Sequence, residues 1–215
     1  MKKFAIVLSG CGVFDGAEIH EATMSMLAVK QQGAEYEIFA PDIPQYHVVN
    51  HLTGEVMDES RNVLIESARI ARGKIKDLKE YKAEDFDALL FPGGFGVAKN
   101  LCTFAIDGVD FKVNEEVKRV VLETVEQKKP IGALCIAPVL IAKVLEGAKV
   151  TIGQDPATAA DIEKMGGTHV NTGHGEVVHD TRYNVFTTPC YMLDATIVDI
   201  HDGAQNVVKA MLETL

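Results

Sequence analysis

The stretch Pro130-Ile131-Gly132-Ala133-Leu134-Cys135-Ile136-Ala137-Pro138 decides the fold. Residues 130–134 form a short apolar run with the length of a buried strand, and residues 136–145 are typical of a helix. Cys135 lies between the two with no loop, so the strand would turn directly into the helix at this residue. Such a junction is a nucleophile elbow, which leaves one side chain exposed at the edge of a sheet.

Apolar runs and helical patterns alternate along the rest of the chain. We expect strands at 4–8, 36–40, 88–91 and 150–152, a late antiparallel pair at 177–178 and 184–187, and helices at 18–32, 60–71, 114–128, 156–165 and 195–215. The last helix should be interrupted or tightened near Asp202-Gly203. Alternating strands and helices indicate crossover units, and therefore a mainly parallel sheet with helices on both faces.

Length and composition favour one domain over residues 1–215. The chain has 215 residues, 47% of them hydrophobic, which is enough for a single large core. No repeat or linker divides it. The segment 43–84 is longer than one crossover needs, so we expect an insertion there, with a short hairpin around Thr53-Gly54.

Charge and cysteine usage limit the partners and the compartment. The formal net charge is -10, without a long run of Lys or Arg, which disfavours nucleic acid as a partner. No apolar stretch approaches the roughly 20 residues that span a bilayer, and the first apolar run is too short for a signal peptide. The four cysteines lie far apart without a CxxC pair, so we expect free thiols and a cytoplasmic protein.

Three segments at the carboxyl ends of expected strands carry candidate chemistry, because ligands of open parallel sheets bind there. Cys135 would lie at a helix N-terminus, which favours the thiolate, and the Ile136 N–H would point to a developing oxyanion. Gly94, in the turn Pro92-Gly93-Gly94, could supply a second donor. Glu18 opens the first helix and could move a proton next to the thiol. Each has a structural alternative: a core cysteine, a tight turn and a helix cap.

These segments also resemble a known family. Phe91-Pro92-Gly93-Gly94, the elbow around Cys135 and the early Glu18 stand in the order seen in the class I glutamine amidotransferase-like, ThiJ/PfpI superfamily. More narrowly, residues 9–16, 95–101 and 187–189 look like the ElbB group, also called sigma cross-reacting proteins. The resemblance covers essentially the whole chain.

The resemblance implies a flavodoxin-like three-layer α/β sandwich, a homodimer and a glutathione-independent glyoxalase. Such an enzyme converts methylglyoxal or glyoxal, both small dicarbonyl substrates, to lactate or glycolate without a metal or organic cofactor. Carried onto this chain, Cys135 is the nucleophile, Glu18 the acid/base, and Gly94 with Ile136 the oxyanion hole.

The chain departs from the wider superfamily in one respect. True glutamine amidotransferases activate the cysteine with a late His-x-Glu pair, but residues 190–194 hold no histidine. Many PfpI members have a histidine directly after the nucleophile, where this chain has Ile136. Both differences disfavour glutamine hydrolysis and proteolysis.

Other thiols and histidines extend the candidate site. Cys11 and Cys190 follow expected strands and could face the same crevice, and His174 is the histidine best placed in the sequence to reach it. His169, His174 and His179 recur at five-residue spacing, which matches no usual zinc pattern, so we expect no metal. Two other classes stay open: a redox-responsive regulatory protein with vestigial catalysis, and a binding module without chemistry.

Overall fold

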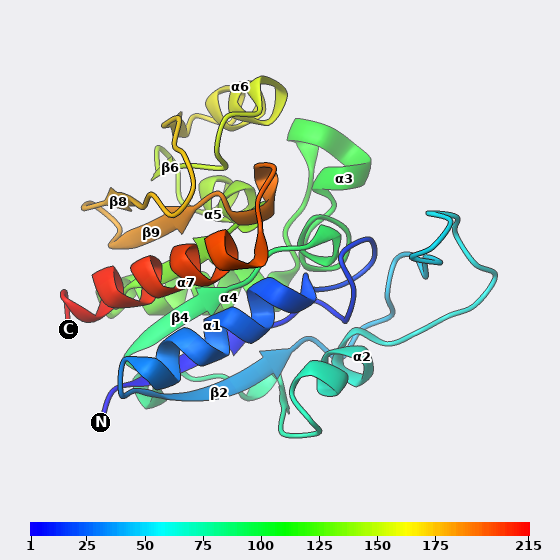
Figure 1. Cartoon of the computed structure of the whole chain (residues 1–215), viewed down its shortest axis with the longest axis horizontal. Helices are drawn as coiled ribbons and strands as arrows, with labels where there is room; N and C mark the ends of the chain where they lie inside the picture. The colour runs from blue at the N-terminus through cyan, green and yellow to red at the C-terminus, as the bar shows by residue number, and fades with distance from the viewer.

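A seven-stranded mixed sheet forms the centre of the molecule (Figure 1). The computed structural model describes residues 1–215. The strand order is β3-β2-β1-β4-β5-β9-β8, and every pair is parallel except β8 with β9. The strands of this sheet are β1 (Lys3–Val7), β2 (Glu35–Ala40), β3 (Lys76–Asp77), β4 (Ala88–Phe91), β5 (Ile131–Leu134), β8 (Val178–Asp180) and β9 (Val185–Thr188).

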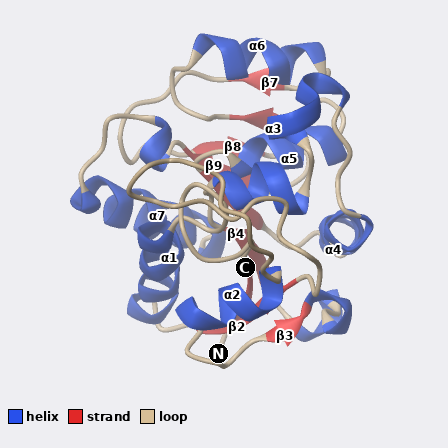
Figure 2. Ribbon diagram, turned by 90° about the vertical axis from the view of Figure 1, so that its right-hand side faces the viewer, coloured by secondary structure: helices blue, strands red, loops and turns tan.

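Helices cover both faces of the sheet, as Figure 2 shows from the side where the loops after the strands face the viewer. The helices are α1 (Ile19–Gln31), α2 (Val63–Ile70), α3 (Phe104–Asp107), α4 (Glu115–Glu126), α5 (Ala137–Val144), α6 (Pro156–Lys164) and α7 (Ile197–Leu212). Alternate residues of β1 separate the two cores: Phe4 and Ile6 pack against α1 and α7, whereas Ala5 and Val7 belong to the core with α4 and α5. The predicted flavodoxin-like three-layer sandwich is confirmed.

Two expectations about secondary structure are wrong. The strand expected at 150–152 is only β6 (Lys149–Val150), and it pairs with β7 (Thr168–His169) in a separate two-stranded sheet. It ends early because the Thr151 N–H donates to the Thr187 hydroxyl, and Gly153 turns the chain at φ +94°. The closing helix α7 runs through Gly203 without interruption. A Cβ there would lie 3.3 Å from Thr188 Oγ1, so glycine allows α7 to approach β9 closely.

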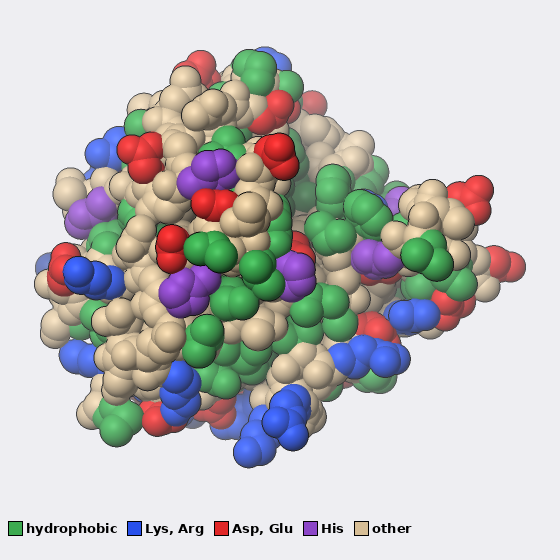
Figure 3. Space-filling view, viewed as in Figure 1, with side chains coloured by type: hydrophobic (Ala, Val, Ile, Leu, Met, Phe, Trp, Pro, Cys, Tyr) green, Lys and Arg blue, Asp and Glu red, His purple; other side chains and the backbone are tan.

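The expected insertion contains a projecting arm, residues 43–62, which extends from the body in Figure 3 with apolar and acidic side chains at its tip. A bridge between Val49 and Val56 closes the predicted hairpin, and a second bridge joins Pro44 to Asn62 at its base. Asn62 caps α2, because its side-chain oxygen accepts the Ile65 N–H at 3.0 Å. No helix of the structure has the length and apolarity needed to cross a membrane.

Candidate active site

Cys135 lies at the elbow between β5 and α5. β5 ends at Leu134, and α5 begins at Ala137 with Pro138 in its first turn. The backbone of Cys135 has φ +60°, in the left-handed region that side chains other than glycine rarely adopt. Its N–H donates to the Thr188 carbonyl at 3.0 Å, which ties the elbow to the end of β9. Strain of this kind, about 1–3 kcal/mol, is concentrated at functional sites.

Backbone donors face the sulfur. The N–H groups of Gly94 and Ile136 act on Cys135 as hydrogen-bond donors and by themselves lower its pKa. Burial and, after it, the charge of Glu21 act more strongly, so the pKa of the thiol stands well above its ordinary value. Both residues expected to form the oxyanion hole therefore lie near the sulfur.

The turn after β4 approaches the thiol closely because it has no side chains. A Cβ on Gly93 would lie 2.5 Å from Cys135 Cβ and 3.0 Å from its Sγ. Gly94 has φ +99°, and a Cβ there would lie 2.3 Å from the Glu18 backbone nitrogen. Glycine is required at both positions for the amide of Gly94 to reach the sulfur.

Glu21, which was not among the residues expected from the sequence, is the carboxyl group beside Cys135. It is completely buried in α1, and both its Oε2 and the Cys135 sulfur lie against the Gly93 backbone. Its Oε2 accepts from the Gly93 N–H at 2.9 Å and its Oε1 from the Tyr191 N–H at 3.3 Å. Burial, with the charge of Glu18 added, raises the pKa of Glu21 to about 8, so the group is mostly protonated at pH 7.

Glu18 caps α1 and is also part of the cavity wall. It is the N-cap of α1, and its Oε2 accepts the Glu21 N–H at 2.7 Å. It also lines the cavity in front of Cys135. A signal for Glu21 was present in the helical periodicity, because Glu21, Ser25 and Ala28 follow one another on the buried side of α1. A carboxylate within such a stripe has no solvent to stabilise its charge.

The other candidates lie outside the cavity. Cys190 is buried behind the site, and burial followed by the charges of Glu21 and Cys135 raises its pKa well above the ordinary value. His174 is exposed and does not line the cavity, in contrast to the expectation. Cys11 lies in a second polar region, beside Glu66 and Asp15. No group of three or more His, Cys, Asp or Glu side chains converges as metal ligands do.

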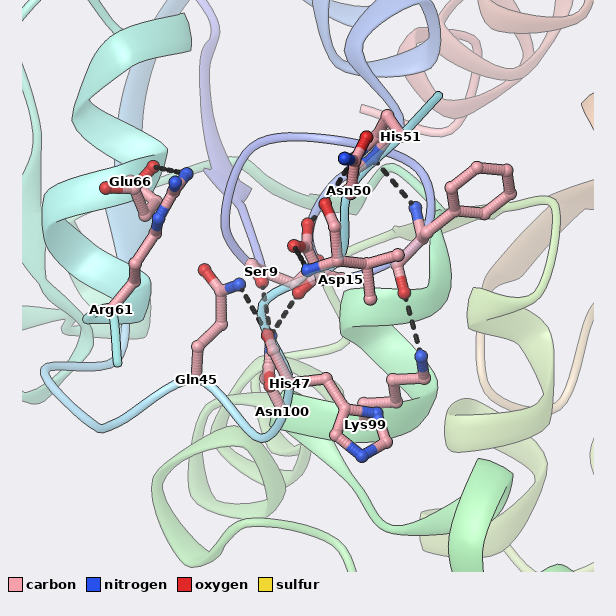
Figure 4. A network of polar contacts seen from close by, with 12 residues as sticks. Ser9, Asp15, Gln45, His47, Asn50, His51, Arg61, Glu66, Lys99 and Asn100 are labelled. Atoms are coloured by element: carbon pink, nitrogen blue, oxygen red, sulfur yellow. Dashed lines mark hydrogen bonds and ion pairs between the residues drawn. The ribbon is translucent and has the colours of Figure 1, made fainter. Parts of the chain in front are cut away.

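That second region joins the arm to the loop after β1 (Figure 4). The Val49 N–H donates to Asp15 Oδ2 at 2.7 Å, and the Phe14 N–H donates to His51 Nε2 at 3.2 Å. Asn100 donates to the carbonyl of Asp15 and accepts from the arm's Tyr46 N–H. This network braces the loop against which the turn after β4 packs.

A cavity of about 280 Å³ opens in front of Cys135. Its walls come from the loop after β1, the turn after β4, α3, the elbow, α6 and the turn after β9. The lining residues are Val13, Glu18, Gly94, Phe95, Ala98, Phe104, Ala105, Cys135, Ile136, Thr158, Tyr191 and Met192. A larger hollow of about 720 Å³ between β2 and the loop after α2 contains no cysteine or histidine, so the smaller cavity is the chemical site.

The model of the DJ-1/PfpI family matches residues 11–190. This chain belongs to the DJ-1/PfpI family. Two similar relatives are a rat protein described as ES1 protein homolog, mitochondrial, and a human protein described as glutamine amidotransferase-like class 1 domain-containing protein 3, mitochondrial. They are 51% and 50% identical to this DJ-1/PfpI chain, with 98% of it and 83% and 82% of their own lengths covered.

Among solved structures, an isoprenoid biosynthesis protein with amidotransferase-like domain from Ehrlichia chaffeensis superposes with a TM-score of 0.92. It is 38% identical, and the match covers 99% of this chain and 100% of that one. The DJ-1/PfpI fold therefore extends over both core layers and the insertion.

Proposed function

We propose that this chain is a glutathione-independent glyoxalase of the ElbB type, in which Cys135 is the nucleophile and Glu21 the acid/base. One observation carries the proposal: a thiol at a strained elbow opens into a cavity and lies beside a fully buried carboxyl group. Glu21 takes over the role first expected of Glu18, because it lies beside the sulfur and has a pKa of about 8.

Attack on the aldehyde is the first step. The carboxylate form of Glu21 accepts the Cys135 proton as the sulfur adds to the aldehyde carbon of methylglyoxal. The aldehyde oxygen gains the electron pair and then a proton, which gives a hemithioacetal. The N–H groups of Gly94 and Ile136 face the reacting sulfur and its new substituent, so they are placed to stabilise the oxyanion.

Proton transfer between the two carbons is the second step. Glu21 or Glu18 removes the proton from the former aldehyde carbon, an enediol forms, and the proton returns to the neighbouring carbon. The product is a lactoyl thioester of Cys135, which water hydrolyses to lactate and the free thiol. The sum is methylglyoxal plus water giving lactic acid, so no cofactor enters the balance. A carboxyl group with a pKa of about 8 suits both directions of transfer.

The same cavity disfavours glutamine as a substrate. Glutamine carries a carboxylate that a binding site normally pairs with a cation, but no Lys, Arg or His lines this cavity. Its ionisable groups are Glu18, Cys135 and the Tyr191 phenol. We therefore expect no glutaminase activity, and ammonia release that disappears in Cys135→Ala would contradict this.

Conversion of methylglyoxal without glutathione tests the proposal. Purified wild type, Cys135→Ala, Glu21→Gln and Glu18→Gln are incubated with methylglyoxal, and lactate is measured. We expect lactate from wild type, none above the blank from Cys135→Ala, and a larger loss in Glu21→Gln than in Glu18→Gln. Equal activity of wild type and Cys135→Ala would overturn the proposal.

A redox-responsive role is the alternative, and the buried thiol with its raised pKa does not favour it. Redox sensors need an exposed cysteine of low pKa, whereas Cys135 is 7% exposed. Peroxide titration followed by peptide mass spectrometry separates the two. Selective sulfenic or sulfinic acid at Cys135, together with a change of oligomeric state, would support the sensor.

A further inference from the structure

The cavity in front of Cys135 is larger and less polar than methylglyoxal requires. Its volume of about 280 Å³ comes close to the roughly 300–1,000 Å³ of small-molecule sites. One water molecule takes about 30 Å³ of liquid. A three-carbon dicarbonyl would therefore leave much of the cavity to water against apolar walls.

Much of the cavity wall consists of apolar side chains from three separate segments. Phe104 begins α3 and packs edge-on against Phe111, with ring centroids 5.3 Å apart. Met192 closes the turn after β9, and Phe95 and Ala98 follow β4. Side chains of this kind stabilise an alkyl or aryl group by excluding water from it.

The charge of the cavity selects against anions. Glu18 is the one acidic side chain on its surface besides the thiol and the phenol, and Glu21 lies directly behind. Lys99 follows the cavity residue Ala98, but its ammonium group points elsewhere. Its Nζ donates a hydrogen bond to the Phe14 carbonyl at 2.8 Å and lies over the ring of Phe95. No cation is left inside to balance a carboxylate or a phosphate, whose desolvation would then be uncompensated.

We propose that the natural substrates of this site are uncharged α-oxoaldehydes that carry an apolar substituent larger than methyl, either branched or linear alkyl or aryl. The reaction itself rests on the proposed glyoxalase function, whereas the apolar and uncharged character rests on the cavity. Phe104 and Met192 are the residues that determine specificity for the substituent.

A homologous series of alkyl glyoxals tests the size of the substituent at constant chemistry. Values of kcat/KM are measured for the methyl, propyl and pentyl compounds and for a carboxyalkyl glyoxal of matched length. We expect kcat/KM to rise about fourfold for each buried methylene group until the cavity is full. The carboxylate should lower it by about tenfold or more. Phe104→Ser should reduce the ratio of pentyl to methyl, with Phe111→Leu, a substitution in the buried core beside Phe104 and outside the cavity, as the control.

Labelling of the thiol provides a second measurement that does not depend on turnover. The rate at which N-methyl-, N-butyl-, N-cyclohexyl- and N-carboxyalkylmaleimide modify Cys135 is followed by peptide mass spectrometry and divided by the rate with a free small thiol. We expect the corrected rate to rise with apolar size and to fall for the carboxylate. Cys135→Ala assigns the signal.

The two measurements separate the outcomes. Labelling that depends on apolar size without any turnover would support the apolar site and reject the glyoxalase function. Turnover with a flat or inverted dependence on chain length would support the glyoxalase function and overturn this inference. Fastest reaction of the carboxylate-bearing compounds in both assays would overturn it as well.

Discussion

Two thiols lie at the ends of parallel strands of the same sheet, Cys135 after β5 and Cys11 after β1. Both have carboxylates beside them, and burial raises the pKa of both. The surroundings of the carboxylates differ. Glu66, near Cys11, forms ion pairs with Arg61 at 3.5 Å and Arg69 at 2.9 Å. Glu21, beside Cys135, has only backbone N–H groups and the thiol as partners.

The difference shows what makes a buried carboxyl group suited to proton transfer near neutral pH. Glu66 forms ion pairs with two arginines, and these pairs hold segments together at the base of the arm. Without a cation, Glu21 shifts its pKa to about 8, where a proton is easily gained and lost near neutral pH. The Cys135 region also has an open cavity and two backbone donors at the sulfur.

The largest effect should separate the two cysteines. We expect Cys135→Ala to lower kcat/KM for an α-oxoaldehyde by at least about 1,000-fold, because the variant lacks the proposed nucleophile. Cys11→Ser should stay within about threefold of wild type, because Cys11 does not line the cavity. Steady-state kinetics on both variants measures the contrast. A similar loss in Cys11→Ser would show that the two regions act as one site.

The next effect should separate the two buried glutamates. Glu21→Gln keeps the shape of the side chain but cannot take the thiol proton, so we expect kcat/KM to fall by about 100- to 10,000-fold. Glu66→Gln serves as the matched control and should remain within about threefold. Circular dichroism checks that both variants are folded. Full activity of Glu21→Gln would assign the acid/base role to Glu18 instead.

The fold could be predicted from the sequence because its signals are local. The apolar run before Cys135 and the glycines after β4 each need only their own neighbours to specify a strand and a tight turn. The extent of β6 was overestimated because its early end depends on the contact of the Thr151 N–H with Thr187, a residue far along the chain. The uninterrupted α7 was missed because Gly203 normally weakens a helix, and its reason here is the contact with β9.

The backbone of the candidate site could be predicted from the sequence, but the carboxyl group that would exchange a proton with the thiol could not. The elbow and the turn identify Cys135, Gly94 and Ile136, because the geometry of each is determined by consecutive residues. The choice between Glu18 and Glu21 depends on which one faces the sulfur across α1, and this needs the tertiary position of the turn after β4. The exposed position of His174 likewise depends on a loop without periodicity.

The pH dependence of activity should report the unpaired carboxyl group. The proposed mechanism uses Glu21, whose pKa is about 8, as the base of the first step, so kcat/KM should rise nearly tenfold per pH unit below pH 8 and level off above it. Rates with an uncharged α-oxoaldehyde between pH 5.5 and about 9.5, in buffers of constant ionic strength, measure the profile. A plateau that begins near pH 5 would contradict the raised pKa.

The smallest effect should appear in stability. Between pH 4.5 and about 8, the folded chain keeps a proton on Glu21 that the unfolded chain has released. More protons in the folded state mean that the free energy of unfolding falls as the pH rises through this window, by a few kcal/mol at most, and levels off above it.

Glu21→Gln removes this loss, because an amide does not titrate. The difference in Tm between the variant and wild type, measured by thermal unfolding, should therefore shift in favour of the variant by several degrees from pH 5 to pH 8.5. Glu66→Gln, whose parent carboxylate is paired with arginine, should show no such gain.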